Sequence, residues 1–311
     1  MTELPLTLTA PDKHPVTGTV FHPDTPVQVL VIAHGMAEHA GRYGGLARWL
    51  GTQGIATVTY NHRGHGPGCP PDQLGHYADQ QGWARVTGDL HQVLTDTRAR
   101  FPDLPLTLFG HSMGSFIAQS CAQQHPEALD RLILSASNRI NRTELGVSGL
   151  LMSGLRWLYG KHHRSPLIAR MTFGKFNRAF APNRTDYDWL SRDPDQVDRY
   201  IADPLCGFPC STGLWHDFIQ GMLTIDPALW RKDLPVHLLA GTMDPVGEMG
   251  KGITRHFQTI RDAGVQQVTL RLFTGGRHEM LNETNTAEVY ACLLELLTEE
   301  PAPSAHGEPK P

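Results

Sequence analysis

The sequence predicts an α/β fold in which helices cover both faces of a mostly parallel sheet. Apolar, β-branched runs alternate with helical stretches along most of the chain, as is typical of parallel strands joined by crossover helices. The alternation stops near residue 137 and resumes near residue 231, so a helical cap is predicted to interrupt the core. A chain of 311 residues is long enough to bury such a core.

The predicted strands are recognised by their residue patterns. The first two alternate apolar and polar residues on either side of Asp12-Lys13, which indicates an antiparallel hairpin at a sheet edge. The run from Val27 to Ala33 is almost continuously apolar, as expected of a strand buried on both faces. In chain order, we expect strands at residues 4–8, 16–21, 27–33, 55–60, 106–109, 132–134, 235–240 and 268–273.

Between these strands, apolar residues recur at helical spacing. Val86, Leu90 and Val93 mark one such face, and Gly51 ends an earlier helix. We therefore predict one core made of residues 1–136 and 231–300, a helical cap at 137–230, and a disordered tail at 301–311, which has too little apolar surface to fold. Core helices are expected at 46–50, 83–94, 115–124, 250–262 and 286–297.

Composition argues against several classes of protein. The net charge of −4 gives no overall attraction to nucleic acid. No apolar run approaches the ~20 residues of a membrane-spanning helix, and the first residues lack the basic and apolar regions of a signal peptide. The five cysteines show no framework spacing, so we expect reduced thiols and a cytoplasmic protein. No protein partner is identifiable.

A candidate nucleophile, Ser112, lies at the centre of a Gly-x-Ser-x-Gly sequence bounded by Gly110 and Gly114. The motif alone is weak, because it arises often by chance. Here a predicted strand precedes it and a predicted helix follows it, which is the context of a nucleophile elbow. The glycines remove side chains where strand and helix cross, and the tight turn lifts the serine hydroxyl clear of the sheet. We therefore favour a catalytic serine over a structural turn.

A serine nucleophile needs a base, and the base needs an orienting carboxylate. Asp244 and His278 follow the two late strands, in the chain order and at the strand ends that this architecture requires. Parallel strands bring their carboxyl ends to one edge, where these side chains meet Ser112. Glu248 remains an alternative carboxylate, and Glu279 an alternative neighbour of the base. We prefer Asp244 because it lies nearer its strand end.

Backbone amides are expected to stabilise the oxyanion that forms during attack. One donor should be the residue after the nucleophile, Met113. The other should come from the loop after the third strand, where Gly35 lets the chain turn and Met36 follows it. Each such donor lowers the barrier by roughly 2.7–4 kcal/mol. The methionine side chains are incidental to this role.

Several motifs together carry a family resemblance: His34-Gly35-Met36-Ala37-Glu38-His39, Asn61-His62-Arg63-Gly64-His65-Gly66, Gly110-His111-Ser112-Met113-Gly114, Gly275-Gly276-Arg277-His278-Glu279-Met280, and the cap segment 203–210. They resemble the α/β-hydrolase superfamily and, within it, the monoacylglycerol lipase and lysophospholipase group of serine hydrolases. The resemblance covers residues 27 to about 300. Asn61 is one departure, because the family often has an acidic residue there.

The resemblance implies the α/β-hydrolase fold, an ester substrate with a fatty acyl chain, and no cofactor. It assigns Ser112 as nucleophile, Asp244 and His278 as its partners, and the amides of Met36 and Met113 as oxyanion donors.

Other polar residues near these motifs receive structural interpretations. For Glu38 we favour an ion pair with Arg42 that holds the oxyanion loop in shape, over contact with a substrate head group. His62 and His65 suggest a metal only weakly, because no carboxylate or cysteine completes a recognisable ligand set. No metal is therefore assigned.

The predicted cap is basic and apolar. Between residues 138 and 184 there are nine basic residues and one acid, Glu144, which leaves a net charge of −12 for the rest of the chain. This asymmetry favours contact with anionic lipid surfaces and, by extension, a lysophospholipid over a neutral glyceride, although a merely solvated basic face remains open. The basic residues are Arg139, Arg142, Arg156, Lys161, Arg164, Arg170, Lys175, Arg178 and Arg184.

The predicted function is therefore hydrolysis of a carboxylic ester, with release of a fatty acid from a lysophospholipid or monoacylglycerol through an acyl-enzyme. A peptidase or thioesterase on the same core is the alternative, because fold does not fix substrate. A non-catalytic ligand-binding protein is the alternative from another class. It would be expected to lack one of the three catalytic residues, and none is missing.

Overall fold

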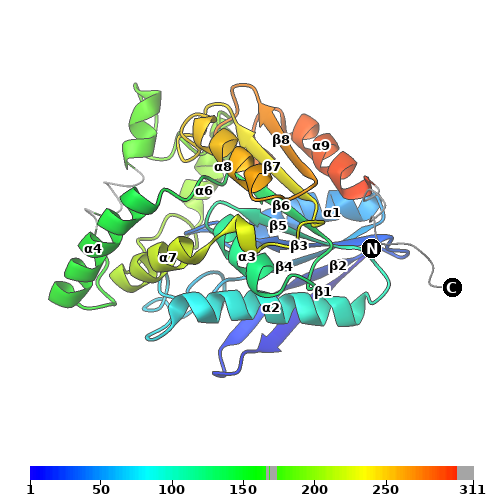
Figure 1. Cartoon of the computed structure of the whole chain (residues 1–311), viewed down its shortest axis with the longest axis horizontal. Coiled ribbons are helices and arrows are strands. Elements are labelled where there is room, and N and C mark those ends of the chain that lie inside the picture. The colour runs from blue at the N-terminus through cyan, green and yellow to red at the C-terminus, as the bar shows by residue number, and fades with distance from the viewer. Residues whose placement is uncertain (166–167, 169–173, 300–311) are drawn as a thin grey trace.

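In a computed structural model, the chain is described over residues 1–165, 168 and 174–299 (Figure 1). The predicted tail at 301–311 and Arg170 lie outside the described residues. An eight-stranded sheet with helices on both faces confirms the predicted α/β fold. No described helix has the length and apolar character needed to cross a bilayer.

The sheet has the order β1-β2-β4-β3-β5-β6-β7-β8. The predicted hairpin, β1 and β2, forms the antiparallel edge of the sheet, and β2 also pairs antiparallel with β4. All the pairings between neighbours from β4 to β8 in this order are parallel. The order of the parallel strands reverses at β3, so the loops after β3 and β5 diverge there and leave a crevice at their carboxyl ends. The strands are β1 (Thr2–Thr9), β2 (Pro15–His22), β3 (Gln28–Ala33), β4 (Ile55–Tyr60), β5 (Leu106–His111), β6 (Arg131–Ser135), β7 (Val236–Gly241) and β8 (Val268–Phe273).

Each face of the sheet has its own apolar core, because successive strand residues point to opposite faces. Along β3, Val29 and Val31 pack on one face, whereas Leu30 and Ile32 pack on the other. The first face is covered by α2 (Gly82–Arg100), α3 (Met113–Gln124) and α8 (Lys251–Asp262), and the second by α1 (Gly44–Thr52) and α9 (Thr286–Thr298) (Figure 1). A short 3₁₀ helix, η1 (Ala40–Tyr43), precedes α1.

The segment between β6 and β7, residues 136–235, is called the insertion below. In Figure 1, α4 and α7 lie beside each other, to one side of the sheet. The side chains of Leu214, Phe218 and Met222 on α7 are buried, whereas Leu150 and Trp157 on α4 are 77% and 86% exposed. The two helices therefore differ, since α7 packs on the core, whereas much of the apolar surface of α4 does not. The insertion contains α4 (Arg142–Tyr159), η2 (Arg178–Phe180), α6 (Pro194–Ala202), α7 (Thr212–Thr224) and η3 (Pro227–Leu229).

The crossing of β5, β3 and α3 is very close. A Cβ on Gly110 would lie 2.6 Å from the carbonyl oxygen of Gly114, and a Cβ on Gly114 would overlap the carbonyl oxygens of Ala33 and His34. Neither site can relieve the overlap by rotating a side chain, because the obstructing atoms belong to the backbone. Only glycine fits at these two positions.

Replacing Gly114 by alanine is therefore expected to lower the free energy of unfolding by about 1–3 kcal/mol. The same replacement at Gly88 is the matched control, because Gly88 is exposed within α2 and nothing lies within 4 Å of its Cβ. Gly88→Ala should raise stability by about 0.5–1 kcal/mol, since alanine loses less chain entropy in a helix. Denaturant unfolding measures both changes. A Gly114→Ala protein as stable as the wild type would contradict the close crossing.

Candidate active site

Ser112 occupies the turn between β5 and α3, with φ +50° and ψ −119°. This conformation is uncommon for a residue with a side chain and costs of order 1–3 kcal/mol. The surrounding structure holds it in place, because the Ser112 amide donates to Ser135 O at 2.9 Å and Ser112 O accepts from the Ser115 amide and hydroxyl. The strained turn directs the Ser112 side chain away from the sheet, as the elbow prediction requires.

The structure brings the three predicted residues into one hydrogen-bonded chain. His278 Nε2 lies 2.9 Å from Ser112 Oγ, and His278 Nδ1 lies 3.0 Å from Asp244 Oδ1. The Asp244 carboxylate is fully buried, and its Oδ1 also accepts from the Val246 amide at 2.9 Å. With Nδ1–H donating to Asp244, the imidazole presents an unprotonated Nε2 to the serine hydroxyl. This is the arrangement of a nucleophile, a base and an orienting carboxylate.

The two alternative carboxylates are engaged elsewhere. Glu248 binds Arg139 at 2.9 Å and Arg255 at 3.0 Å. Glu279 makes a bidentate pair with Arg42, with two contacts of 2.7 Å. Among the described carboxylates, Asp244 is therefore the partner of the His278 imidazole.

The protonation of His278 is set by two opposing effects. Burial disfavours the charged imidazolium, but the charge of Asp244 and its hydrogen bond outweigh burial and raise the pKa of His278. A base with a raised pKa accepts the serine proton more readily.

The three consecutive backbone amides of the oxyanion loop, residues 35–37, differ in their hydrogen-bond partners. The Gly35 amide donates to Glu38 Oε1, and the Ala37 amide donates to His65 Nε2 at 3.2 Å. The Met36 amide has no acceptor among the described residues. The Met113 amide opens helix α3, where the first N–H groups lack intrahelical partners. Both amides are therefore free of intrahelical or loop acceptors among the described residues, and their role as oxyanion donors stays a prediction.

Sequence analysis missed the buried histidines that hold this loop. His34 Nδ1 donates to Gly35 O at 2.7 Å, His34 Nε2 accepts from the His62 amide at 3.0 Å, and His65 Nδ1 donates to Arg63 O at 2.8 Å. Burial lowers the pKa of His34 to about 3 and that of His65 to about 4, so both rings are neutral and keep these bonds. The His-Gly and Arg-Gly-His-Gly motifs contain these histidines, but they were interpreted only as a family resemblance and, for His62 and His65, as a weak indication of a metal.

The Glu38–Arg42 ion pair expected from the sequence is confirmed, at 2.6 Å. Glu38 also accepts from the Tyr43 hydroxyl at 2.8 Å. Burial alone would raise the pKa of Glu38, but the Arg42 guanidinium and nearby histidines outweigh it and lower this pKa to about 2. Glu38 is therefore a carboxylate at working pH and can accept the Gly35 amide continuously. With Glu279 on the other side, Arg42 is shared between two carboxylates beside the pocket.

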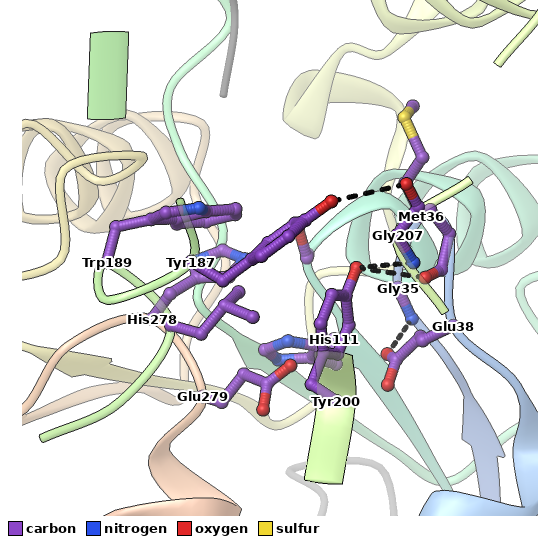
Figure 2. Close-up of a pocket in the computed structure, with 13 residues that line it drawn as sticks. Gly35, Met36, Glu38, His111, Tyr187, Trp189, Tyr200, Gly207, His278 and Glu279 are labelled. Carbon is purple, nitrogen blue, oxygen red and sulfur yellow. Dashed lines mark hydrogen bonds between the residues drawn. The ribbon is translucent and has the colours of Figure 1, made fainter. Parts of the chain in front are cut away.

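The insertion completes the pocket over Ser112 (Figure 2). Tyr187, Trp189 and Tyr200 line this pocket together with His278 and Glu279, and the Trp189 ring lies beside that of His278, with the centroids 4.9 Å apart. The Tyr200 hydroxyl donates to Ala37 O at 3.0 Å, so a side chain of the insertion also supports the oxyanion loop. The aromatic spacing in this part of the sequence did not reveal these contacts.

One group near the pocket has potential metal ligands, namely His39, Asp203 and Cys206. His39 Nδ1 accepts from the Gly41 amide, so His39 Nε2 carries the proton and donates to Asp203 Oδ2 at 2.9 Å. That proton occupies the position a metal ion would need. This group therefore acts as a hydrogen-bonded link between η1 and the insertion.

Comparison with known proteins gives consistent relationships. A model of the family described as serine aminopeptidase, S33 matches residues 24–285. The chain is 30% identical over 277 residues to the monoacylglycerol lipase of Mycolicibacterium smegmatis, covering 85% of this chain and 86% of the relative. It is 28% identical over 263 residues to the monoglyceride lipase of Mus musculus, covering 83% and 78%. A thermostable carboxyl esterase from Bacillus coagulans, solved with glycerol, superposes with a TM-score of 0.86 at 25% identity, covering 95% of this chain and 98% of that chain.

Replacing Asp244 by asparagine should reduce kcat on an activated ester by about ten-thousand-fold and move the acid limb of the kcat/KM profile to lower pH. Activity rises with pH as His278 loses its proton. Because Asp244 raises the pKa of His278, removing its charge lowers that pKa and the limb follows. Glu248→Gln is the control and should leave the limb unchanged. An unshifted limb in Asp244→Asn would refute the pairing.

Proposed function

The chain belongs to the serine aminopeptidase S33 family of α/β-hydrolases, and we propose that it hydrolyses the ester of a monoacylglycerol, releasing a fatty acid. The observation that carries the proposal is the continuous contact from Ser112 through His278 to Asp244, beside an amide at Met36 that has no acceptor among the described residues. The monoacylglycerol lipase and monoglyceride lipase relatives support the substrate class.

In the proposed mechanism, His278 Nε2 takes the proton of Ser112 as its oxygen attacks the ester carbonyl. The amides of Met36 and Met113 stabilise the resulting oxyanion. As the acyl-enzyme forms, the C–O bond to glycerol breaks and the departing alkoxide takes the proton from His278. Water then attacks the acyl group, again with His278 as base, and the fatty acid leaves.

The charges near the pocket favour a neutral glycerol head group over a phosphate. Glu38 and Glu279 supply two carboxylates, and Arg42 is the cation paired with both. The local balance is therefore negative, which repels a lysophospholipid phosphate and leaves acceptors for glycerol hydroxyls. A monoacylglycerol is therefore preferred here over the lysophospholipid that the basic cap favoured.

The basic residues of the insertion are mostly engaged in bonds to the protein itself. Of the eight between residues 138 and 184 that the structure describes, seven contact a carboxylate or a backbone carbonyl, which argues against charge as the main attraction to lipid. The acceptors are Glu248 for Arg139, Leu223 O for Arg142, Asp217 for Arg156, Asp79 for Lys161, Leu74 O for Arg164, Gly174 O for Arg178 and Asp198 for Arg184.

We further propose that residues 137–230 act as a cap and that α4 rests on lipid. The α4 side chains with exposed apolar surface include Leu150 and Trp157, and water-exposed groups of this kind gain free energy on entering a lipid interface. A cytoplasmic location, peripheral to the membrane, remains our proposal. The free thiols of all five cysteines support it.

One observation favours a second activity, an aminopeptidase. Glu38 and Glu279 border the pocket, and carboxylates can bind the free amino terminus of a peptide. Both are already paired with Arg42, which weakens their attraction for a second cation. Because the matching family is described as serine aminopeptidase, S33, a peptidase substrate is included in the assay below.

The first test measures fatty-acid release from a 1-monoacylglycerol and from lysophosphatidylcholine of equal chain length, with an aminoacyl nitroanilide as third substrate. We expect the glyceride to have the largest kcat/KM, by about tenfold or more over the lysophospholipid, since one unfavourable charge contact of ~1.4 kcal/mol gives that factor. Ser112→Ala should abolish turnover.

The possible outcomes of this assay test the nucleophile and the substrate class separately. Labelling of Ser112 by a fluorophosphonate without cleavage of either lipid would retain the nucleophile and refute the lipid substrate. Faster turnover of the nitroanilide would favour the aminopeptidase. Equal activity of Ser112→Ala and wild type would refute the nucleophile itself.

The second test is partitioning onto neutral phosphatidylcholine vesicles by flotation. Trp157→Ser should weaken binding by about tenfold or more, because a buried large apolar side chain contributes about 1.5–3 kcal/mol. Val27→Ser is the control: Val27 is 63% exposed at the amino end of β3, at the opposite edge from the pocket. Binding that required anionic lipid and fell steeply with salt would instead support the basic-cap hypothesis.

A further inference from the structure

Outside the pocket, two imidazoles and a carboxylate converge where the loop between β4 and α2 meets the turn after α4. His76 and Asp79 belong to the loop, and His162 belongs to the turn. Asp79 Oδ1 lies 3.3 Å from His76 Nε2 and 2.9 Å from His162 Nε2, and the two ring centroids are 4.2 Å apart. The three side chains therefore bring one potential ligand atom each to within 4.8 Å of the other two.

His76 is held in the orientation that a metal-binding histidine needs. It is only 6% exposed, and its Nδ1 lies 2.8 Å from Ser211 Oγ, which also accepts from the Leu214 amide. A bond of this kind to one ring nitrogen fixes the ring and leaves the other nitrogen to act as ligand. Here that nitrogen is Nε2, the one that faces Asp79.

The backbone around the three side chains is rigidly joined. The amide of Ser211 donates to Gly75 O, that of Thr212 to His163 O, and that of Gly213 to Lys161 O, each at 2.8 Å. A Cβ on Gly213 would lie 2.9 Å from the His76 ring and from Lys161 O, so glycine is what allows the ring to pack there. The donor atoms are thus brought together by bonds that need no metal ion.

From this geometry we infer that His76, Asp79 and His162 bind a divalent transition metal ion, with Zn²⁺ the best match. Two imidazole nitrogens and one carboxylate oxygen suit zinc, whereas Mg²⁺ and Ca²⁺ prefer oxygen ligands alone. Tetrahedral zinc with bonds of about 2.0–2.2 Å places neighbouring ligand atoms about 3.4 Å apart, close to the distances around Asp79. Nothing in the proposed ester hydrolysis is needed for this inference.

Without a metal, Lys161 neutralises Asp79, with Nζ 3.1 Å from Oδ1. Lys161, Asp79 and His162 are all partly exposed, at 35%, 62% and 55%, so the lysine can turn outward and water can fill a fourth coordination position. The bound ion would join the core loop to the end of α4. That loop also carries Tyr77, whose hydroxyl lies 2.9 Å from Met113 Sδ, so the ion would steady a segment packed against the active-site turn.

The test titrates ZnCl₂ into the chelator-treated full chain by calorimetry and follows thermal unfolding. We expect one ion per chain and a rise in Tm of about 3 °C or more at saturating zinc, with no rise in MgCl₂. His162→Ala and Asp79→Asn should each weaken binding by tenfold or more. Both side chains are more than half exposed, so these variants are expected to fold.

His163→Ala is the matched control, because His163 is adjacent in sequence but stacks on Tyr159 instead. It should bind zinc as the wild type does. Failure of the wild type to bind, or undiminished binding by His162→Ala, would overturn the inference. A thiolate-to-metal charge-transfer band in the Co²⁺ form would overturn it too, because the proposed site has no cysteine, whereas the group of His39, Asp203 and Cys206 has one.

Discussion

The close crossing of β5, β3 and α3 is the constraint on which the rest of the structure depends. It forces glycine at positions 110 and 114, and it forces Ser112 into a backbone conformation that a residue with a side chain rarely adopts. The cost, of order 1–3 kcal/mol, is offset by strands buried on both faces and by helices packed on each. The strain has a consequence, since it leaves the Ser112 hydroxyl facing His278 and the Met113 amide at the free end of a helix.

A second set of contacts decides which amides near Ser112 are available. Glu38 occupies the Gly35 amide and His65 occupies the Ala37 amide, so the Met36 amide is left between two that are already bonded. Both acceptors depend on protonation state. The pKa of Glu38 is lowered to about 2 and that of His65 to about 4, which keeps both groups able to accept across the ordinary pH range. The loop is therefore shaped by groups whose charge is fixed by burial and by their neighbours.

The insertion shows why a charge count in sequence differs from a charge distribution in space. Residues 138–184 of the insertion carry a net charge of +8, yet Arg139, Lys161 and Arg184 each face a carboxylate distant in sequence or on another element. Meanwhile the carboxylates of Glu38 and Glu279 meet beside the pocket around one arginine. We therefore expect substrate preference to follow the local balance of charge at the pocket, because charges near the reacting groups act at short range and with less screening.

The sequence alone determined the fold class, and it placed the nucleophile Ser112 and the base His278 after their strands, because each of these follows from local patterns. Apolar runs specify buried strands, glycines mark the close crossing, and parallel strands bring their following loops to one edge. Only the tertiary structure decided which carboxylate orients His278 and how exposed the α4 face is. It alone brought His34 and His65 beneath the oxyanion loop and His76 beside His162. These depend on contacts between residues far apart in the chain, and periodicity carries no information about such partners.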